Sequence, residues 1–499
     1  MAMEKLEKDK LDFLLHICMI IGIVYGICFY KNNTGIACVV FGIFLVLIIG
    51  WIKNIKRDKE MDFMHWFYSV SLVLLSLIPS VFDNLFLNVV GRILFIVILI
   101  KWVITIYYRG KEFDLLRNLY MILCFIPHSF IKMFSLYPDI RKEKGYKNME
   151  NLSTIENEPQ KENKSSYKKQ ILKGVLMSVP FLVVIISLLT SADIVFKNMV
   201  ENLFSGASNF EIIIKWCFTV FIGFMLAYGS GRLLLSGEID TDEVKLRQSD
   251  TVVGITFAGI IAGVYILFCI TQIVTILSAG GDMLPEGYTY AKYARTGFFQ
   301  LLFVCMINVA LVVMCRLKFD TGSVLKKILV VISGCTYLMV VSSTFRILLY
   351  IKAYNLTFLR ILVIWALLVI GVLMVFVIWF IFNPKIRLFE YALVTTVILF
   401  LGFSAINPDK MIASYNIKNS SMNNKDAGYL VRNLSMDMAE VIISDEVVNE
   451  FANEEIVLDY CKEIVEEYEK KDKKDIRKFN YSRYQAYKLS KNYLETVKQ

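Results

Sequence analysis

The sequence predicts an all-α, polytopic helical membrane protein. Of its 499 residues, 56% are hydrophobic, and the mean hydropathy is +0.56, which is above the apolar content of soluble domains. The apolar residues also fall into blocks of about twenty with few charges, which is the length that a helix needs to cross roughly 30 Å of hydrocarbon. This composition disfavours a soluble enzyme.

The apolar blocks predict about eleven transmembrane helices. We expect them at 11–30, 34–52, 63–82, 85–108, 171–191, 211–235, 251–279, 298–316, 328–349, 361–382 and 389–406. The segment 115–138 is also apolar, but Pro127, His128 and Lys132 interrupt it. We therefore expect this segment to be interfacial or re-entrant.

The spans divide the chain into four regions. Residues 1–138 are predicted to form an N-terminal membrane module of four spans plus the interfacial segment, and residues 171–406 a C-terminal membrane module of seven spans. Residues 139–170 are rich in Lys, Glu, Asn and Ser and lack apolar periodicity, which predicts a disordered linker. Residues 407–499 combine charges with apolar residues at helical spacing, which predicts a small helical tail domain.

The distribution of Lys and Arg predicts the orientation. With a cytoplasmic N-terminus, basic residues gather in the loops assigned to the inside, including the linker, as the positive-inside rule requires. An odd number of spans then places the tail outside the membrane. We expect this extracytoplasmic tail to pack on the membrane surface through Tyr429, Leu430, Leu434, Val441 and Ile442.

The sequence lacks several enzyme signatures. It contains no His-Glu-x-x-His pair, no Gly-x-x-x-x-Gly-Lys-Ser/Thr loop and no Cys-x-x-Cys pair among its ten cysteines, so it offers no zinc-protease site, P-loop or zinc framework. We therefore name no catalytic residue, metal site or cofactor, and whether the chain is an enzyme is left open, with the balance against it. The expected partners are membrane lipids and not nucleic acid.

Two features inside the predicted spans have alternative interpretations. Gly254, Ala258 and Ala262 recur at four-residue spacing and predict close helix packing. Arg92 and Lys101 lie deep in one span, where charged residues are costly and often functional. They could pair with Asp12 or face a polar crevice.

Arginines and tyrosines gather on loops assigned to the outer side of the second module. These residues are Tyr290, Tyr293, Arg295, Arg346, Tyr350, Tyr354 and Arg360. Arginine donates paired hydrogen bonds to phosphate, and tyrosine is at home in the headgroup layer. We expect an anion-binding pocket here. Two alternatives are that Asp282, Glu286 and Asp409 neutralise the arginines internally, and that the tyrosines of the 280–297 loop are an aromatic belt.

Helix-stop signals lie beside these residues. Asn355 tolerates the left-handed conformation that ends a helix, and Asn407 and Pro408 begin the next element where the last span ends. On the predicted topology, the loop at 280–297, the segment around Arg346 and Arg360, and the start of the tail all meet at one membrane surface.

Four ordered motifs carry a resemblance to a known family. They are Tyr-Ala-x-Tyr-Ala-Arg-x-Gly-Phe at 290–298; Arg346 with Leu349-Tyr350 and Tyr354-x-Leu-Thr-x-x-Arg360; Asn407-Pro408 with Ile412-Ala413 and Asn416; and Asp426-x-x-Tyr429-Leu430 with Leu434-Ser435. The chain resembles a bacterial multi-pass membrane family of unknown function, domain of unknown function number 4173. The resemblance implies a bacterial cytoplasmic-membrane location and no catalytic residues. Where that family has a glycine before the Leu-Thr pair, this chain has Asn355, and an acidic residue expected after Tyr350 is missing.

Three functions remain open at this stage, and a purely structural or assembly role is the alternative to all three. The first is a non-enzymatic membrane protein that binds an anionic lipid or envelope-precursor group, with the tail as a cap or as an arm for an envelope partner. The second is a secondary transporter or lipid-handling permease with Arg92 or Lys101 on its pathway. The third is an intramembrane transferase acting on lipid phosphates, with Asp282, Glu286 or Asp409 as general base.

Overall fold

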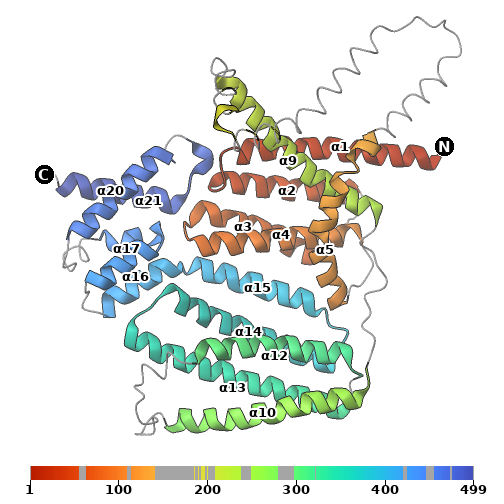
Figure 1. Cartoon of the computed structure of the whole chain (residues 1–499), viewed down its shortest axis with the longest axis vertical. Helices are drawn as coiled ribbons and strands as arrows, with labels where there is room; N and C mark the ends of the chain where they lie inside the picture. The colour runs from red at the N-terminus through yellow and green to blue at the C-terminus, as the bar shows by residue number, and fades with distance from the viewer. Residues whose placement is uncertain are drawn as a thin grey trace, which may run out of the picture. The chain divides into compact units, whose positions relative to one another are not determined.

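A computed structural model describes most of the chain (Figure 1). The described residues are 2–55, 63–108, 114–140, 185, 189, 193–196, 199, 208–237, 249–278, 297–320, 322–419, 424–444, 454–471 and 475–497. Within these ranges every regular element is a helix, and Ser249 and Phe319 form an isolated β-bridge. The all-α prediction is therefore confirmed.

Ten of the described helices are long and apolar enough to cross a membrane. They are α1 (Ala2–Phe29), α2 (Ile36–Ile55), α3 (Phe63–Val81), α4 (Leu85–Tyr107), α9 (Ser208–Ser236), α10 (Thr251–Ser278), α12 (Phe298–Lys318), α13 (Ser323–Tyr354), α14 (Phe358–Phe382) and α15 (Leu388–Ala405). Each corresponds to one predicted span, so the chain is a multi-pass membrane protein. The remaining predicted span, 171–191, and the predicted linker from residue 141 onward lie almost entirely outside the described residues.

The segment predicted to be interfacial contains helix α5 (Leu115–Met133), which carries Pro127 in its interior. This helix is not among the ten candidate spans. Residues 136–140 are also helical, and Asp139, which the sequence assigns to the disordered linker, is buried. Ordered structure in this region therefore extends to residue 140.

The chain divides into two compact units, which we describe separately. Unit 1 comprises residues 1–65, 100–109 and 121–241, and unit 2 comprises residues 66–99, 110–120 and 242–499. Helices α3, α4 and α5 each contribute residues to both units. The division into two membrane modules, a linker and a tail stays a prediction.

In unit 1, α1 and α9 pack together through glycines. A Cβ atom added at Gly22 or Gly26 would lie within 2.8 or 2.3 Å of Val220, and one added at Gly223 would lie within 2.6 Å of Tyr25. Small residues allow helix backbones to approach closely, and this contact needs them because lipid provides no hydrophobic drive for association.

Unit 1 also buries polar groups. The Arg232 Nε lies 2.6 Å from the Asp139 carboxylate, and the Tyr228 hydroxyl donates to the same carboxylate at 2.6 Å. Lys101 is 2% exposed, whereas Arg92, which belongs to unit 2, is exposed. The two deep cations therefore differ in environment.

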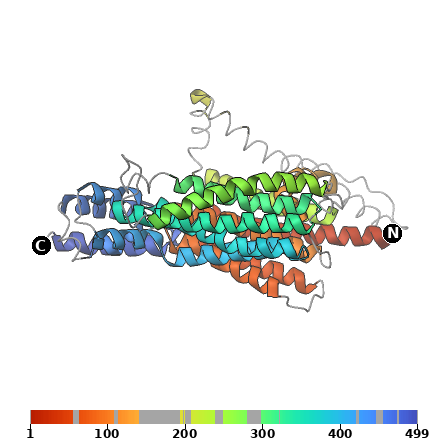
Figure 2. The ribbon, with the colours of Figure 1, turned by 90° about the horizontal axis from the view of Figure 1, so that it is seen from below.

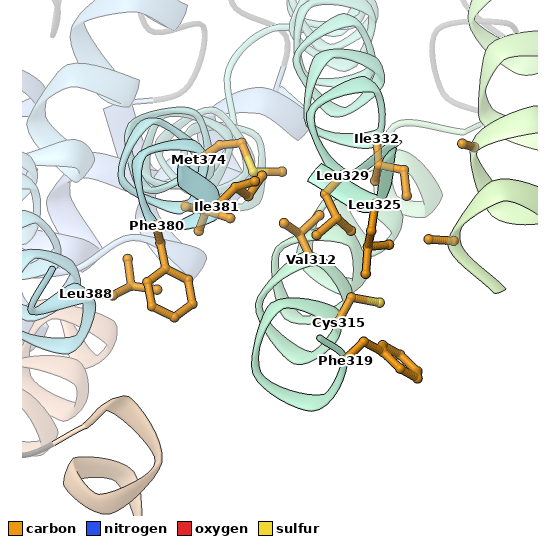
Figure 3. Close-up of a cluster of buried hydrophobic side chains, with 13 residues drawn as sticks. Val312, Cys315, Phe319, Leu325, Leu329, Ile332, Met374, Phe380, Ile381 and Leu388 are labelled. Carbon is orange, nitrogen blue, oxygen red and sulfur yellow. The ribbon is translucent and has the colours of Figure 1, made fainter. Parts of the chain in front are cut away.

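The apolar core of unit 2 is built by α10, α12, α13 and α14 (Figure 3). Val312 and Cys315 of α12 meet Leu325, Leu329 and Ile332 of α13 in this core. Ala258 and Ala262 of α10 are buried in the same cluster, and a Cβ added at Gly254 would lie 2.7 Å from Phe319. The small-residue stripe is therefore a packing surface, as the sequence predicts.

The tail of unit 2 consists of short helices beyond the end of α15 (Figure 2). They are α16 (Pro408–Asn419), α17 (Asn424–Asn433), η1 (Met436–Met438), α18 (Ala439–Ile442), α20 (Glu454–Lys471), η2 (Ile476–Lys478) and α21 (Tyr481–Val497). Within this tail, α20 pairs with α21, and α16 contacts η1, α18 and the span α14. Leu430 and Ile442 are completely buried. The tail thus has an apolar interior of its own.

Candidate functional site

A polar cluster lies at the break between α13 and α14. We call it the α13–α14 cluster, and its members are Arg346, Tyr350, Tyr354, Asn355, Arg360 and Asn416. Asn355 ends α13 with a φ of 64°, in line with the prediction that it tolerates a left-handed stop. The next residue, Leu356, is buried and cannot join either helix ladder. Asn416 of α16 satisfies its backbone, because the Asn416 side chain accepts from the Leu356 N–H at 2.8 Å and donates to the Leu356 carbonyl at 2.9 Å.

The tail also contacts the first turn of α14. The Phe358 N–H donates to the Tyr429 hydroxyl of α17 at 3.5 Å. Beside Asn416, Ile412 and Ala413 are completely buried. The motif residues of the tail therefore pack on the break that interrupts α13 and α14.

Arg360 lies over this break. Its guanidinium carbon is 4.1 Å from the centroid of the Tyr350 ring, which is a cation–π geometry. Its Nη1 donates to the carbonyls of Tyr354, at 2.7 Å, and Asn355. Tyr354 is 53% exposed and its ring packs 5.1 Å from that of Tyr350. In the part of the chain that the structure describes, no carboxylate forms an ion pair with Arg360.

Arg346 lies on α13, about two turns before that helix ends at Tyr354. Its contacts differ from those of Arg360. Its Nη2 donates to the Gln272 side-chain oxygen of α10 at 2.9 Å, and the Ser342 hydroxyl donates to the same oxygen at 2.7 Å. A Cβ added at Gly297 would lie 2.6 Å from the Arg346 Nη1, and Gly297 has a φ of 104°. A side chain at position 297 would therefore meet both steric and backbone strain.

The motifs singled out in the sequence meet in this cluster. Gly297 approaches Arg346, and the ring of Phe298 is 6.0 Å from that of Tyr350. Tyr290, Tyr293, Arg295, Asp282 and Glu286 lie outside the described residues, so their share of the predicted pocket stays a prediction. Asp409 is described, and its hydrogen bonds go to a second cluster and not to the arginines.

The second cluster, the aspartate cluster, joins the loop between α3 and α4 to the tail. The Asp437 carboxylate of η1 accepts the backbone N–H groups of Asp83 at 2.8 Å and Asn84 at 3.2 Å. Asn84 also caps α4 by accepting from the Leu87 N–H at 3.1 Å. Asp437 therefore lies at the N-terminus of α4, where the helix dipole favours negative charge.

Asp409 lies in the first turn of α16 and is 1% exposed. Its Oδ2 accepts from the Asn84 amide at 2.8 Å, from the Ser435 N–H at 3.1 Å and from the Ser435 hydroxyl. Its Oδ1 is buried and has no hydrogen-bond partner among the described residues. One oxygen of this carboxylate thus takes all three bonds.

Helix α21 completes the aspartate cluster. The Arg483 Nε is 2.6 Å from the Asp83 Oδ1 in an ion pair that is mostly sheltered from solvent. Asn480 caps α21 by accepting from the Arg483 N–H at 3.0 Å, and its amide donates to the carbonyls of Pro79 and Phe82 at 3.1 and 3.0 Å. The C-terminal helices are therefore bonded directly to the α3–α4 loop.

Burial changes the acidity of this cluster. Desolvation raises the pKa of Asp437 to about 6, helped by the charges of Asp83 and Asp409 and opposed by hydrogen bonds from Ser482 and the Asp83 backbone. Burial also raises the pKa of the Tyr460 hydroxyl of α20, and the three aspartates add to this effect. The cluster is therefore an environment that resists negative charge.

Sequence reasoning missed most of the aspartate cluster. Of these residues, only Asp409 was considered from the sequence, as a counter-charge for the arginines or as a general base. The Asp83-Asn84 pair before an apolar run is a helix-start signal, and the predicted topology places that loop on the same side as the tail. Those two signals together could have identified the contact, but nothing in the sequence indicates Asp437 or Arg483 as partners.

Comparison with known proteins identifies the family. The model of a family described as Domain of unknown function (DUF4153) matches residues 69–444, which is about three-quarters of the chain. The match includes the α13–α14 cluster and the three aspartates, whereas Asn480 and Arg483 lie beyond its end. No curated protein and no solved structure matches the chain. The family number 4173 suggested by the motifs is wrong, although a family of unknown function is confirmed: the chain belongs to the DUF4153 family of domains of unknown function.

Proposed function

We propose that this membrane protein is non-enzymatic and binds an anionic phosphate-bearing group, carried by a lipid or an envelope precursor, at the α13–α14 cluster. The observation that carries the proposal is the state of Arg360. Its contacts are two carbonyls and an aromatic face, so no carboxylate among the described residues neutralises its charge. A cation at a membrane interface needs a counter-charge, and a headgroup phosphate provides one.

The surroundings of Arg360 suit such a ligand. Tyr350 and Tyr354 form an aromatic pair beside the guanidinium, and Lys352 in the same helical turn is exposed. Tyrosine rings are comfortable at headgroup depth, and their hydroxyls can donate to phosphate oxygens. Tyr290, Tyr293 and Arg295 belong to the proposed site on the strength of the sequence.

Arg346 has a different part in the proposal. Its hydrogen bond to Gln272 fixes it between α10 and α13, so we expect it to position the end of α13 and to contribute its positive field. Arg360 is the residue that we expect to contact the anion.

The transporter and the transferase receive less support. Lys101 is 2% exposed and Arg92 is exposed, and neither observation by itself indicates a transport pathway. A general base must reach its substrate's proton, but Asp409 is buried and its Oδ2 is occupied by three donors. Non-enzymatic binding therefore remains the best-supported function.

Native mass spectrometry of the purified full chain tests the proposal. We expect co-purified anionic lipid or precursor to fall at least several-fold in Arg360→Gln, and partly in Arg360→Lys, which keeps the charge but loses the paired donors. Arg346→Lys should lose less than Arg360→Lys. Reconstitution with phosphatidylglycerol or with free phosphate then distinguishes a lipid from a soluble anion.

The matched control is Arg387→Gln. Arg387 pairs with Glu390 at the start of α15, whereas the cluster lies near the end of that helix, so it should not change the bound anion. Equal anion content in wild type and Arg360→Gln, at equal folded yield, would refute the proposal.

A further inference from the structure

We propose that Asp437, which faces the charge of the buried Asp409, is a proton-binding site that fastens the C-terminal helices to the α3–α4 loop when it is protonated and loosens them when it is not. The proposal is independent of anion binding at the α13–α14 cluster. It follows from the charge balance, hydrogen bonding and burial of the aspartate cluster.

The cluster contains more negative than positive charge. Asp83, Asp409 and Asp437 come from three separate elements, and Arg483 is the cation that bonds to them in the part of the chain the structure describes. Arg483 is bonded to Asp83, so that pair is neutral. Two carboxylates at 1% and 6% exposure then remain, and two such buried charges are too costly to keep together.

The hydrogen bonds leave room for a proton. All three donors to Asp409 bind its Oδ2, while its Oδ1 is buried without a partner among the described residues. No donor among the described residues therefore stabilises negative charge on this oxygen, and the Asp409 charge acts on Asp437. On Asp437, the longer hydrogen bond is the 3.2 Å contact from the Asn84 N–H. A proton on the oxygen that accepts this bond would therefore weaken only the longer of the two backbone contacts.

The charged and polar groups around Asp437 determine whether its pKa is raised or lowered. The charges of Asp83 and Asp409 disfavour ionisation of Asp437, while the Ser482 hydroxyl and the Asp83 backbone N–H favour it. The outcome is a pKa of about 6 for Asp437, above its ordinary value of 3.8. Lys410, next to Asp409, is instead engaged by Glu440 at 2.6 Å. The closed arrangement therefore binds a proton more tightly than a solvated, open one.

This coupling makes the attachment of the tail dependent on pH. The site connects α16 and η1 to the loop, and Arg483 and Asn480 of α21 bond to the same loop. When Asp437 loses its proton, repulsion opposes all of these contacts together. The attachment should be tightest below about pH 3.8 and become progressively weaker as the pH rises to about 6.

Hydrogen exchange on the intact chain in lipid nanodiscs tests this inference. After correction for intrinsic exchange, protection of residues 83–87 and 480–485 should fall between pH 3.5 and pH 7, by about 100-fold for a shift from 3.8 to about 6. Asp437→Asn, which mimics the protonated form, should keep its protection nearly constant over that range. Asp459→Asn is the matched control, because Asp459 is exposed and pairs with Lys462, and it should behave as wild type.

Two results would overturn the proposal: protection in wild type that does not change with pH, or Asp437→Asn that loses protection as steeply as wild type. If Asp437→Asn fails to fold, infrared titration of the wild-type protein decides the question. The band of a protonated carboxyl should disappear between pH 5 and pH 7, with Asp409→Asn altering it. A spectrum without that change would contradict the inference.

Discussion

Replacing Asn416 by alanine removes the side chain that joins the tail to the α13–α14 break. Two of its hydrogen bonds go to the backbone of Leu356, and Asn416 and Leu356 are 5% and 4% exposed. Because Asn355 has a positive φ and ends the helix, water or another side chain would have to replace two buried bonds. Each unpaired buried group costs about 1–3 kcal/mol, so Asn416→Ala should lower the free energy of unfolding by about 2–4 kcal/mol.

Chemical denaturation of the purified chain in mixed micelles, followed by intrinsic fluorescence, measures this loss. Asn419→Ala is the matched control on the same helix, since the Asn419 amide is exposed and bonds only within α16 to the Tyr415 carbonyl. It should cost a few tenths of a kcal/mol. Asn416→Asp separates the two bonds, because an ionised carboxylate can accept from the Leu356 N–H but cannot donate to its carbonyl. Equal stability of Asn416→Ala and Asn419→Ala would show that the break is held by other contacts.

Three further predictions concern local strain and orientation. Asn355→Gly should stabilise the chain by about 1 kcal/mol because glycine adopts a φ of 64° without strain, whereas Asn355→Val should destabilise it; unfolding midpoints that rank the other way would contradict this. Gly297→Ala should cost about 1–2 kcal/mol and displace Arg346, since its Cβ would lie 2.6 Å from the guanidinium; unchanged stability and unchanged anion content would refute the expectation. A reporter fused at Gln499 should be active on the extracytoplasmic side of the membrane, and one fused within 139–170 on the cytoplasmic side. A cytoplasmic signal at Gln499 would make the predicted span count wrong.

The fold class was predictable because bilayer thickness fixes the length and composition of a span. The ten described spans match predicted blocks for that reason. Helix α13 is longer than predicted: it runs Ser323–Tyr354, five residues beyond the predicted span 328–349 at each end. Lys326 and Lys327 delayed the predicted start, since a hydropathy pattern treats charges as boundaries even where the helix continues into the headgroup layer.

The α13–α14 cluster was predictable in part. Arg346, Tyr350, Tyr354 and Arg360 lie close along the chain, so their association follows from helical spacing, and Asn355 was identified as the helix stop. The tail contacts were harder to predict. Leu356 and Asn416 are 60 residues apart, and Asp83 and Arg483 are 400 apart. Such long-range pairs depend on how the spans are arranged, which apolar periodicity does not specify.

Asp437 and Asp475 predict opposite changes of stability with pH. The folded-state pKa of Asp437 is raised to about 6 from 3.8, so its penalty on the folded state appears as the pH rises above 3.8 and is complete above 6. A shift of about two units corresponds to about 3 kcal/mol. Asp437→Asn removes this penalty but loses the acceptor for the Asn84 N–H, which costs about 1 kcal/mol.

Asp437→Asn should therefore be more stable than wild type by about 2 kcal/mol at pH 8, and slightly less stable at pH 3.5. Asp475 behaves in the other direction, since the hydrogen bond from Arg477 holds its pKa below the ordinary value. The stability that it contributes is present near neutral pH and is lost on acidification. Asp475→Asn should therefore cost roughly 0.5 kcal/mol at pH 8 for a partly exposed pair, and progressively less as the pH falls below 3.8. Denaturant midpoints measured from pH 3 to pH 8 distinguish the two variants, and a stability difference between wild type and Asp437→Asn that does not change with pH would show that Asp437 keeps one protonation state throughout.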